Sequence, residues 1–332
     1  MSVNETKSDA FLRFDRDGVR KNVDIHCLSG LNQFKRIIRS YAFFHLFFFG
    51  LLLAEIFAFF IFLTPLFQMA LVALSVAIIL VTGFAYLMFL FYFQTKKPEQ
   101  FLELRNYFMH LCKRELPESL LSSEYHLLLA SAAYRFASKL GGQDSLIQFK
   151  SNALSLNHLM SKFINLCHKR DIQRMKEVLL IVSINEHIQL IKDVPTDLEA
   201  HASLANVYVT LSRLYHNQEK SKFRGAAKKA IQEFKIVDYY SPKDPWVHAQ
   251  LASCYHDIEM FDEEIKEYET ILHLCPEDTH ILFRLGTLYF RQGENAKGLK
   301  IYEQLQSMQC SRADELLEFY DSNLEREYRN NM

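Results

Sequence analysis

Hydrophobic and polar residues are segregated along this chain, with one long apolar stretch near its start and amphipathic segments after it. Residues 41–63 contain only His45 and Glu55 as acidic or basic side chains, and residues 67–93 contain none. At 1.5 Å per residue, each segment is long enough to cross the roughly 30 Å hydrocarbon core of a membrane as a helix. Only Thr64, Pro65 and Leu66 separate the two segments, so the pattern predicts a transmembrane hairpin over 41–94.

A signal peptide and a buried soluble hairpin both fit the apolar stretch less well. A cleaved signal peptide is disfavoured because about 40 largely polar residues precede the stretch and no small-residue cleavage site follows it. A buried hairpin in a soluble core is disfavoured because the phenylalanine clusters at 43–44 and 47–49 leave no polar face. The sequence therefore favours two membrane spans.

Basic residues flank the hairpin on both sides. Lys35, Arg36 and Arg39 precede it, Lys96, Lys97 and Arg105 follow it, and its turn carries no charge. Because basic flanks stay in the cytosol, we expect an integral membrane protein with two spans and both termini on the cytosolic side.

Glu55 is an acidic residue near the middle of the first span. Insertion scales assign a charged group at this depth a cost of about 2.5–3.5 kcal/mol. One interpretation is an ion or proton path, but two spans alone do not form a conduit. The pattern favours a hydrogen bond from Glu55 to a hydroxyl such as Ser75 or Thr82, or to a second copy in an oligomer formed through the hairpin.

The N-terminal segment, residues 1–40, mixes charges of both signs, and its first ten residues are polar enough to predict disorder. From Leu31 to Ile38 apolar residues recur at helical spacing. This segment is either a short amphipathic helix at the membrane surface or an extension of the first span, and both alternatives stay open.

After the hairpin the chain has few turn-forming residues, with ten glycines and seven prolines in all 332 residues. Amphipathic helices are predicted near 99–115, 118–140, 145–169 and 172–193. Together they form a helical spacer over 95–195, which has some features of a degenerate repeat. The fold class is all-α, with long helices and short connections.

A repeat of 34 residues is the most specific pattern in the chain. Leu251, Ala252 and Tyr255 recur as Leu285, Gly286 and Tyr289, and the same interval takes Ile265 to Leu299 and Tyr268 to Tyr302. The period and the residue types resemble the tetratricopeptide repeat (TPR) family, in which paired helices stack into an α-solenoid. The resemblance covers about 197–330 of a repeat domain spanning 196–332.

The resemblance places full units at 245–278 and 279–312, an interrupted unit at about 197–244 and a capping helix at 313–330. The interval from Leu204 to Leu251 is 47, thirteen residues more than one repeat, and we expect the surplus near 216–225 to lengthen a helix or form a protruding turn. Family members usually have alanine at one position of the second helix, where Glu264 and Gly298 stand here, so we expect looser packing there.

In the TPR family the first helices of the pairs line a groove that holds a protein or peptide. In some members, side chains at five positions of the groove clamp a C-terminal carboxylate. Four of the five positions correspond to Asn206, Gln250, His280 and Arg284 here. At the fifth position Ala202 replaces a lysine, which favours an unspecialised groove. Trp246, the only tryptophan, is more typical of packing between units than of a ligand anchor. The resemblance implies these groove residues: Asn206, Thr210, Trp246, Gln250, Ser253, Asp257, His280, Phe283, Arg284, Thr287 and Arg291.

The composition contains no pattern typical of catalysis. The net charge of -1 gives no reason to expect nucleic acid as a partner. The six cysteines form no CxxC pair, the histidines lack paired metal-ligand spacing, and no nucleotide-binding or hydrolase motif occurs. We expect no enzyme, no metal and no cofactor.

Two functions remain, from different classes. The first is a membrane-anchored adaptor or scaffold whose repeats bind a protein or peptide at the cytosolic face. The second is a subunit of a larger membrane complex, such as transport or secretion machinery, in which the hairpin assembles and the repeats are an assembly surface. The layout is also similar to that of bacterial inclusion-membrane proteins with a two-span hairpin. In either case the lipid bilayer is a partner.

Overall fold

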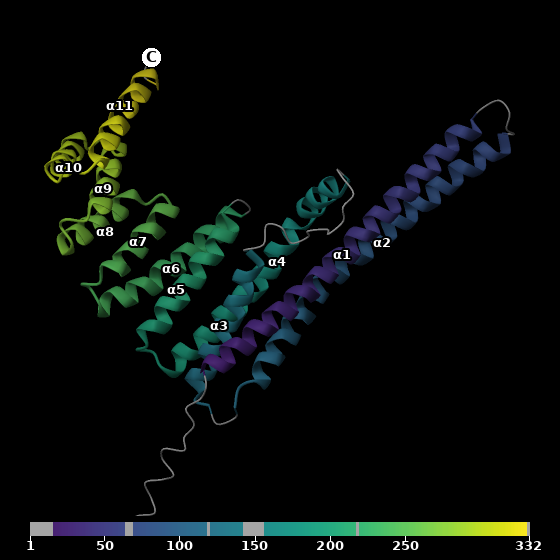
Figure 1. Cartoon of the computed structure of the whole chain (residues 1–332), viewed down its shortest axis with the longest axis horizontal. Helices are drawn as coiled ribbons and strands as arrows, with labels where there is room; N and C mark the ends of the chain where they lie inside the picture. Colours follow the sequence, from purple (N-terminus) through teal and green to yellow (C-terminus); the bar gives the residue numbers. More distant parts are fainter. Residues whose placement is uncertain (1–15, 64–68, 118–119, 142–155, 217–218, 331–332) are drawn as a thin grey trace, which may run out of the picture. The chain divides into compact units, whose positions relative to one another are not determined.

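The computed structural model describes residues 16–63, 69–117, 120–141, 156–216 and 219–330, and these fold into helices without strands (Figure 1). Two compact units divide the chain, Met1–Glu186 and His187–Met332. The first ten residues, the expected turn at Thr64–Leu66 and part of the predicted 145–169 helix lie outside the described residues. The helices are α1 Arg16–Phe62, α2 Met69–Arg114, α3 Ser122–Gly141, α4 Leu156–Asp193, α5 Leu198–Tyr215, α6 Lys220–Tyr240, α7 Pro245–Asp257, α8 Phe261–Leu274, α9 Thr279–Arg291, α10 Asn295–Ser307 and α11 Arg312–Asn330.

The first two helices run side by side and are far longer than a membrane is thick. α1 has 47 residues and α2 has 46, so each extends about 70 Å. α1 is continuous from Arg16 to Phe62, so the segment before the apolar stretch belongs to the same helix. Each helix therefore has an apolar half near the turn and a more polar half that forms a stalk.

Two expected helix boundaries are wrong. α2 continues through Pro98, where the sequence suggested a new helix, although a proline removes one backbone hydrogen bond and typically destabilises a helix interior by about 3 kcal/mol. Lys97 and Gln100, on either side of it, both contact Tyr41 of α1, which holds this part of α2 in place. The break expected near residue 170 is also absent, because no glycine or proline lies there and α4 continues.

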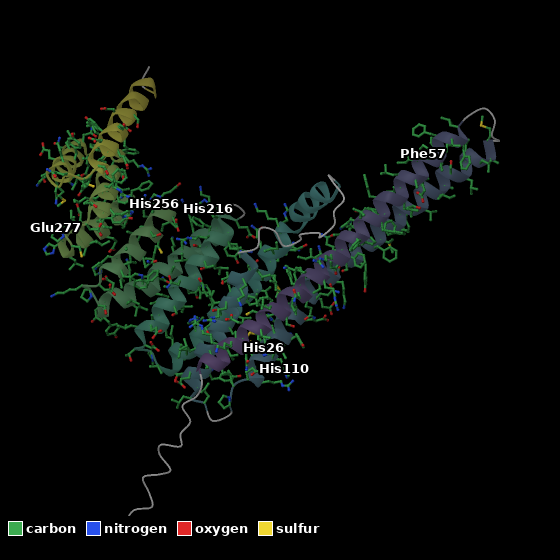
Figure 2. The ribbon with its side chains drawn as sticks, in the orientation of Figure 1. His26, Phe57, His110, His216, His256 and Glu277 are labelled. Atoms are coloured by element: carbon green, nitrogen blue, oxygen red, sulfur yellow. The ribbon has the colours of Figure 1, made fainter. Side chains whose placement is uncertain are left out.

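The apolar half of the hairpin keeps large hydrophobic side chains on its outside. Phe47 and Phe57 of α1 and Phe84 of α2 are 65%, 69% and 67% exposed (Phe57 is labelled in Figure 2). The inner side is aromatic, with Phe44 and Phe93 ring centroids 4.6 Å apart. Both helices are long and apolar enough to cross a membrane. In the most apolar 18-residue segment of each helix, almost no residue is buried.

Glu55 has one of the hydrogen bonds expected of it. The Thr82 hydroxyl donates to Glu55 Oε1 at 2.6 Å, whereas the Ser75 hydroxyl donates to the backbone oxygen of Val72. The other carboxylate oxygen, Oε2, is buried and has no hydrogen-bond partner among the described residues. Glu55 therefore links the two helices of the hairpin to each other.

The stalk has its own hydrophobic core, formed by α1, α2 and α3. Phe34 of α1 packs on Phe101 of α2 with centroids 5.4 Å apart, and Phe108 of α2 packs on Phe136 of α3 at 4.7 Å. A Cβ added to Gly30 of α1 would lie 2.8 Å from the Phe136 ring. The three helices meet around the Phe136 ring, which is fully buried.

α3 and α4 form a hairpin that crosses at small residues. The Ser183 hydroxyl of α4 donates to the backbone oxygen of Ala130 of α3 at 2.9 Å, and both residues are fully buried. His126 Nδ1 and Glu186 Oε2 lie 2.7 Å apart further along the pair. Close crossing at small residues is the same arrangement that the repeat sequence predicts for later helices.

In the second unit each helix from α5 to α11 packs against the next in the chain. The repeated positions are internal: Leu251, Ala252 and Tyr255 of α7 are buried, as are Leu285 and Tyr289 of α9. This stacking of helix pairs is an α-solenoid. α5 and α6, with 18 and 21 residues, are longer than α7 to α10, with 13 or 14, so the surplus residues of this pair extend both of its helices.

The first helix of each pair starts after the same sequence, proline, any residue, aspartate. Asp197, Asp244 and Asp278 precede α5, α7 and α9, and each side chain accepts hydrogen bonds from backbone N–H groups of the first turn. Such N-caps contribute roughly 1 kcal/mol each. The repeat boundaries are therefore fixed by a local capping interaction.

The expectation of loose packing at the second-helix position is wrong. Gly298 is buried, and an added Cβ would collide with the Phe290 ring. Glu264 is only 3% exposed, and its Oε2 lies 3.0 Å from His256 Nδ1. Glycine leaves room for an aromatic ring, and the glutamate is accommodated by a histidine.

Gly298→Val is expected to lower the free energy of unfolding by about 1–3 kcal/mol, because the larger side chain has to displace the buried Phe290 ring. Gly225→Ala is the matched control. A Cβ at Gly225 in α6 meets nothing within 4 Å, so this change is expected to stabilise by about 0.5–1 kcal/mol. Urea denaturation followed by circular dichroism measures both, and equal midpoints would contradict the packing described.

Candidate functional site

The candidate groove residues lie on the first helices of three successive pairs, and none of them is buried. Trp246, at 44%, and His280, Arg284 and Arg291 are exposed. The others are partly exposed: Asn206 and Thr210 of α5, Gln250, Ser253 and Asp257 of α7, and Phe283 and Thr287 of α9.

Side chains bridge neighbouring first helices at both ends of this surface. Arg213 Nε of α5 lies 3.9 Å from Asp257 Oδ2 of α7. Further on, the guanidinium of Arg312 in α11 lies 5.4 Å from the centroid of the Phe283 ring of α9. Asp257 and Phe283 thus each contact a side chain of another helix while remaining partly exposed.

Trp246 packs at the junction of two repeats. Its ring meets the fully buried Phe234 of α6 edge to face, with centroids 6.0 Å apart. The packing role expected from the sequence and a ligand-facing role are compatible here, because nearly half of the side chain is exposed.

The charge on this surface is mainly basic toward its C-terminal end. Arg284 and Arg291 of α9 are exposed, and next to them the carboxyl of Glu264 is buried in α8. Burial raises the pKa of Glu264, opposed by the hydrogen bond with His256 and by the positive charges of both arginines. His256 of α7, labelled in Figure 2, contacts Glu264 of α8, and its side chain is 45% exposed. The arrangement suits a ligand with carboxylates.

Two histidines that the sequence left without a role brace the repeats. His201 Nδ1 lies 2.6 Å from Glu233 Oε2 and its Nε2 lies 3.1 Å from the Pro195 carbonyl. His248 repeats this geometry with Glu267 at 2.7 Å and Pro242 at 3.1 Å. In both histidines each ring nitrogen lies within hydrogen-bond distance of an acceptor. The signal in the sequence is a histidine six residues after the proline of the first two capping motifs; the third has Leu282 at this position.

The stability of the second unit is expected to fall as pH rises above about 6.5. Burial would lower the pKa of His248, but hydrogen bonds to Glu267 and Pro242 and the charges of Asp238 and Glu267 outweigh it, so the pKa is raised. The stabilisation is complete below the unfolded-state pKa near 6.5 and is lost as pH rises through the folded-state value. Urea midpoints from pH 6 to 9 should fall more steeply for the wild type than for His248→Gln.

The matched control for this pH dependence is His280→Gln, which removes an exposed histidine from the same unit. Its midpoints should follow those of the wild type. If the urea midpoint of the His248→Gln protein falls with pH as steeply as those of the wild type and of His280→Gln, the buried histidine is not charged in the folded state.

Three of the cysteines are buried. Burial raises the pKa of the Cys27 thiol to about 11 and those of Cys112 and Cys254 to about 12, so these thiols are protonated and poor nucleophiles at neutral pH. Within the described part of the chain, no group of three or more His, Cys, Asp or Glu side chains is placed to hold a metal ion.

No protein-family model matches the chain, and no curated protein matches it. Solved structures give partial overall similarity. "MamA MSR-1 C2" has a TM-score of 0.37 and 15% identity over 68% of this chain and 95% of its own.

Two further structures are TPR proteins. TTC0263 of Thermus thermophilus has a TM-score of 0.32 and 19% identity over 59% of this chain and 98% of its own. The TPR2AB domain of yeast Sti1, in a complex with pHSP90, has a TM-score of 0.26 and 16% identity over 69% of this chain and 97% of its own. No comparison supports the similarity in layout to inclusion-membrane proteins. The helical-repeat architecture of this chain rests on its own packing, described above.

Proposed function

We propose that the chain is a membrane-anchored adaptor, in which the α1–α2 hairpin spans the bilayer twice and the repeats bind a protein or peptide at the cytosolic face. The single observation that carries the anchoring is the exposed apolar surface of the hairpin, which is unfavourable in water and has no polar side. The basic flanks support cytosolic termini. The proposal includes no catalytic step.

The groove on α5, α7 and α9 is the proposed binding surface. Arg284 and Arg291 are exposed cations on one helix face, and the partly exposed Phe283 and Trp246 offer apolar contact near them. Aromatic and arginine side chains contribute most to binding at protein interfaces. We infer that the ligand is an extended or helical peptide with acidic side chains, read by the arginines of α9.

The second candidate function is assembly through the hairpin. The observation that favours it is Glu55, whose Oε2 has no hydrogen-bond partner among the described residues and whose position implies a cost in lipid. Under this alternative the hairpin joins other membrane helices, and the repeats only support the assembly.

One capture experiment separates the two. The full chain, solubilised in mild detergent, is immobilised and challenged with solubilised extract, and retained proteins are quantified by mass spectrometry. Arg284→Glu is expected to reduce the retained partner about tenfold or more, while Glu55→Leu leaves it unchanged. Lys300→Glu, an equal charge change at an exposed residue of α10, is the control. Loss with Glu55→Leu and retention with Arg284→Glu would assign the function to the hairpin.

A further inference from the structure

Basic side chains of α1 and α2 meet at one level, where the apolar half of the hairpin ends. The Tyr41 ring of α1 meets Phe93 of α2 edge to face at 5.1 Å, and its hydroxyl donates to Gln100 at 2.8 Å. Residues 34–41 of α1 therefore lie beside residues 93–101 of α2. The first range carries Lys35, Arg36 and Arg39, and the second carries Lys96 and Lys97.

A third helix, distant in sequence, reaches the same level. Lys97 Nζ lies 2.8 Å from Asp171 Oδ2 of α4, and the two side chains are only 18% and 7% exposed. Lys97 Nζ also lies 4.6 Å from the centroid of the Tyr41 ring. This largely buried ion pair brings Lys169 and Arg170, both exposed, to the end of the apolar surface.

Most of these cations are not used for internal ion pairs. Lys96 pairs with Glu99 at 2.9 Å and Lys97 with Asp171. Five others form no ion pair with another described residue and constitute what we call the basic belt: Lys35, Arg36, Arg39, Lys169 and Arg170.

The belt is a local excess of charge in a nearly neutral chain. Segments 32–40, 94–105 and 169–174 together contain nine basic and three acidic residues, whereas the whole chain has a net charge of -1. Tyr41 and Tyr92 lie at the same boundary, where aromatic residues mark the interface between hydrocarbon and headgroups. The belt therefore directly continues the surface proposed to contact lipid.

We propose that the basic belt binds the headgroups of anionic phospholipids, and that Lys169 and Arg170 of α4 are contacts to the bilayer surface. The proposal rests on the membrane anchoring proposed above and adds a lipid class and a further helix to it. Each basic residue near an anionic membrane surface strengthens attraction roughly fivefold. Arginine also forms bidentate hydrogen bonds with phosphate oxygens.

The test is lipid retention by the full chain. The protein is purified from mixed micelles of detergent with equal amounts of phosphatidylglycerol and phosphatidylcholine, and the bound lipids are quantified by mass spectrometry. The wild type is expected to retain phosphatidylglycerol in preference by about fivefold or more. The double variant Lys169→Gln with Arg170→Gln, which leaves the Lys97–Asp171 pair intact, is expected to lose most of that preference.

The charge-matched control is Lys228→Gln with Lys300→Gln, at exposed positions of α6 and α10, which should retain the wild-type preference. If the α4 variant keeps the wild-type preference for phosphatidylglycerol, or if the wild type has no such preference, the proposal that the basic belt binds anionic headgroups is overturned. Displacement of the lipid by soluble glycerol phosphate also overturns it, since the site would then bind isolated phosphate. A chain that retains neither lipid and stays dispersed without detergent contradicts the anchoring itself, which is a distinguishable result.

Discussion

Phe136→Ala is expected to lower the free energy of unfolding of the first unit by about 3–5 kcal/mol. The ring is fully buried, packs on Phe108 with centroids 4.7 Å apart and lies against Gly30 of α1. Its removal leaves a cavity where α1, α2 and α3 meet, and surrounding residues typically fill such a cavity only in part. Urea denaturation in detergent, followed by circular dichroism, measures the loss.

The matched control is Tyr107→Ala, which removes an aromatic ring from α2 where it is 49% exposed. Its effect should stay within about 0.5 kcal/mol. If both variants unfold at the same urea concentration, Phe136 is not at the centre of the stalk and the packing of α3 on the hairpin is incorrect.

Phe234→Ala is expected to destabilise the second unit by a similar amount, about 3–5 kcal/mol. Phe234 is fully buried in α6 and meets the ring of Trp246 in α7, so its loss loosens two successive repeats at once. Because Trp246 is the only tryptophan of the chain, its fluorescence reports this junction directly. The emission should shift to longer wavelength as the indole gains water.

Tyr239→Ala is the control for this variant, since Tyr239 is an aromatic residue of the same helix that is 79% exposed. It should leave both the emission and the urea midpoint nearly unchanged. An unshifted emission in Phe234→Ala, together with an unchanged midpoint, would mean that α6 and α7 do not pack through this ring.

The sequence predicted the helical content and the repeat because both depend on local periodicity. Leu251, Ala252 and Tyr255 recur at a fixed interval, and a buried helix face requires that spacing. The hydroxyl partner of Glu55 was also among the expected ones, because a carboxyl group in an apolar helix hairpin has few polar side chains within reach. These inferences need only the order of residues and the cost of burying polar groups.

The remaining features depend on tertiary contacts that a local pattern does not contain. Pro98 suggested a helix end, but α2 continues because Lys97 and Gln100 are held by Tyr41 of α1. Gly298 suggested loose packing, yet it accommodates the Phe290 ring from the preceding helix. The pairing of Lys97 with Asp171 joins residues 74 positions apart, and no spacing rule predicts it.

The behaviour of the full-length chain after detergent removal in the presence of liposomes decides whether the hairpin is a membrane anchor. We predict that the chain floats with the liposomes and resists extraction at alkaline pH, because transfer of the exposed phenylalanine surface of α1 and α2 from water to lipid is favourable. A chain that remains monodisperse in plain buffer would show that this surface is covered by protein, and the anchored adaptor would be contradicted.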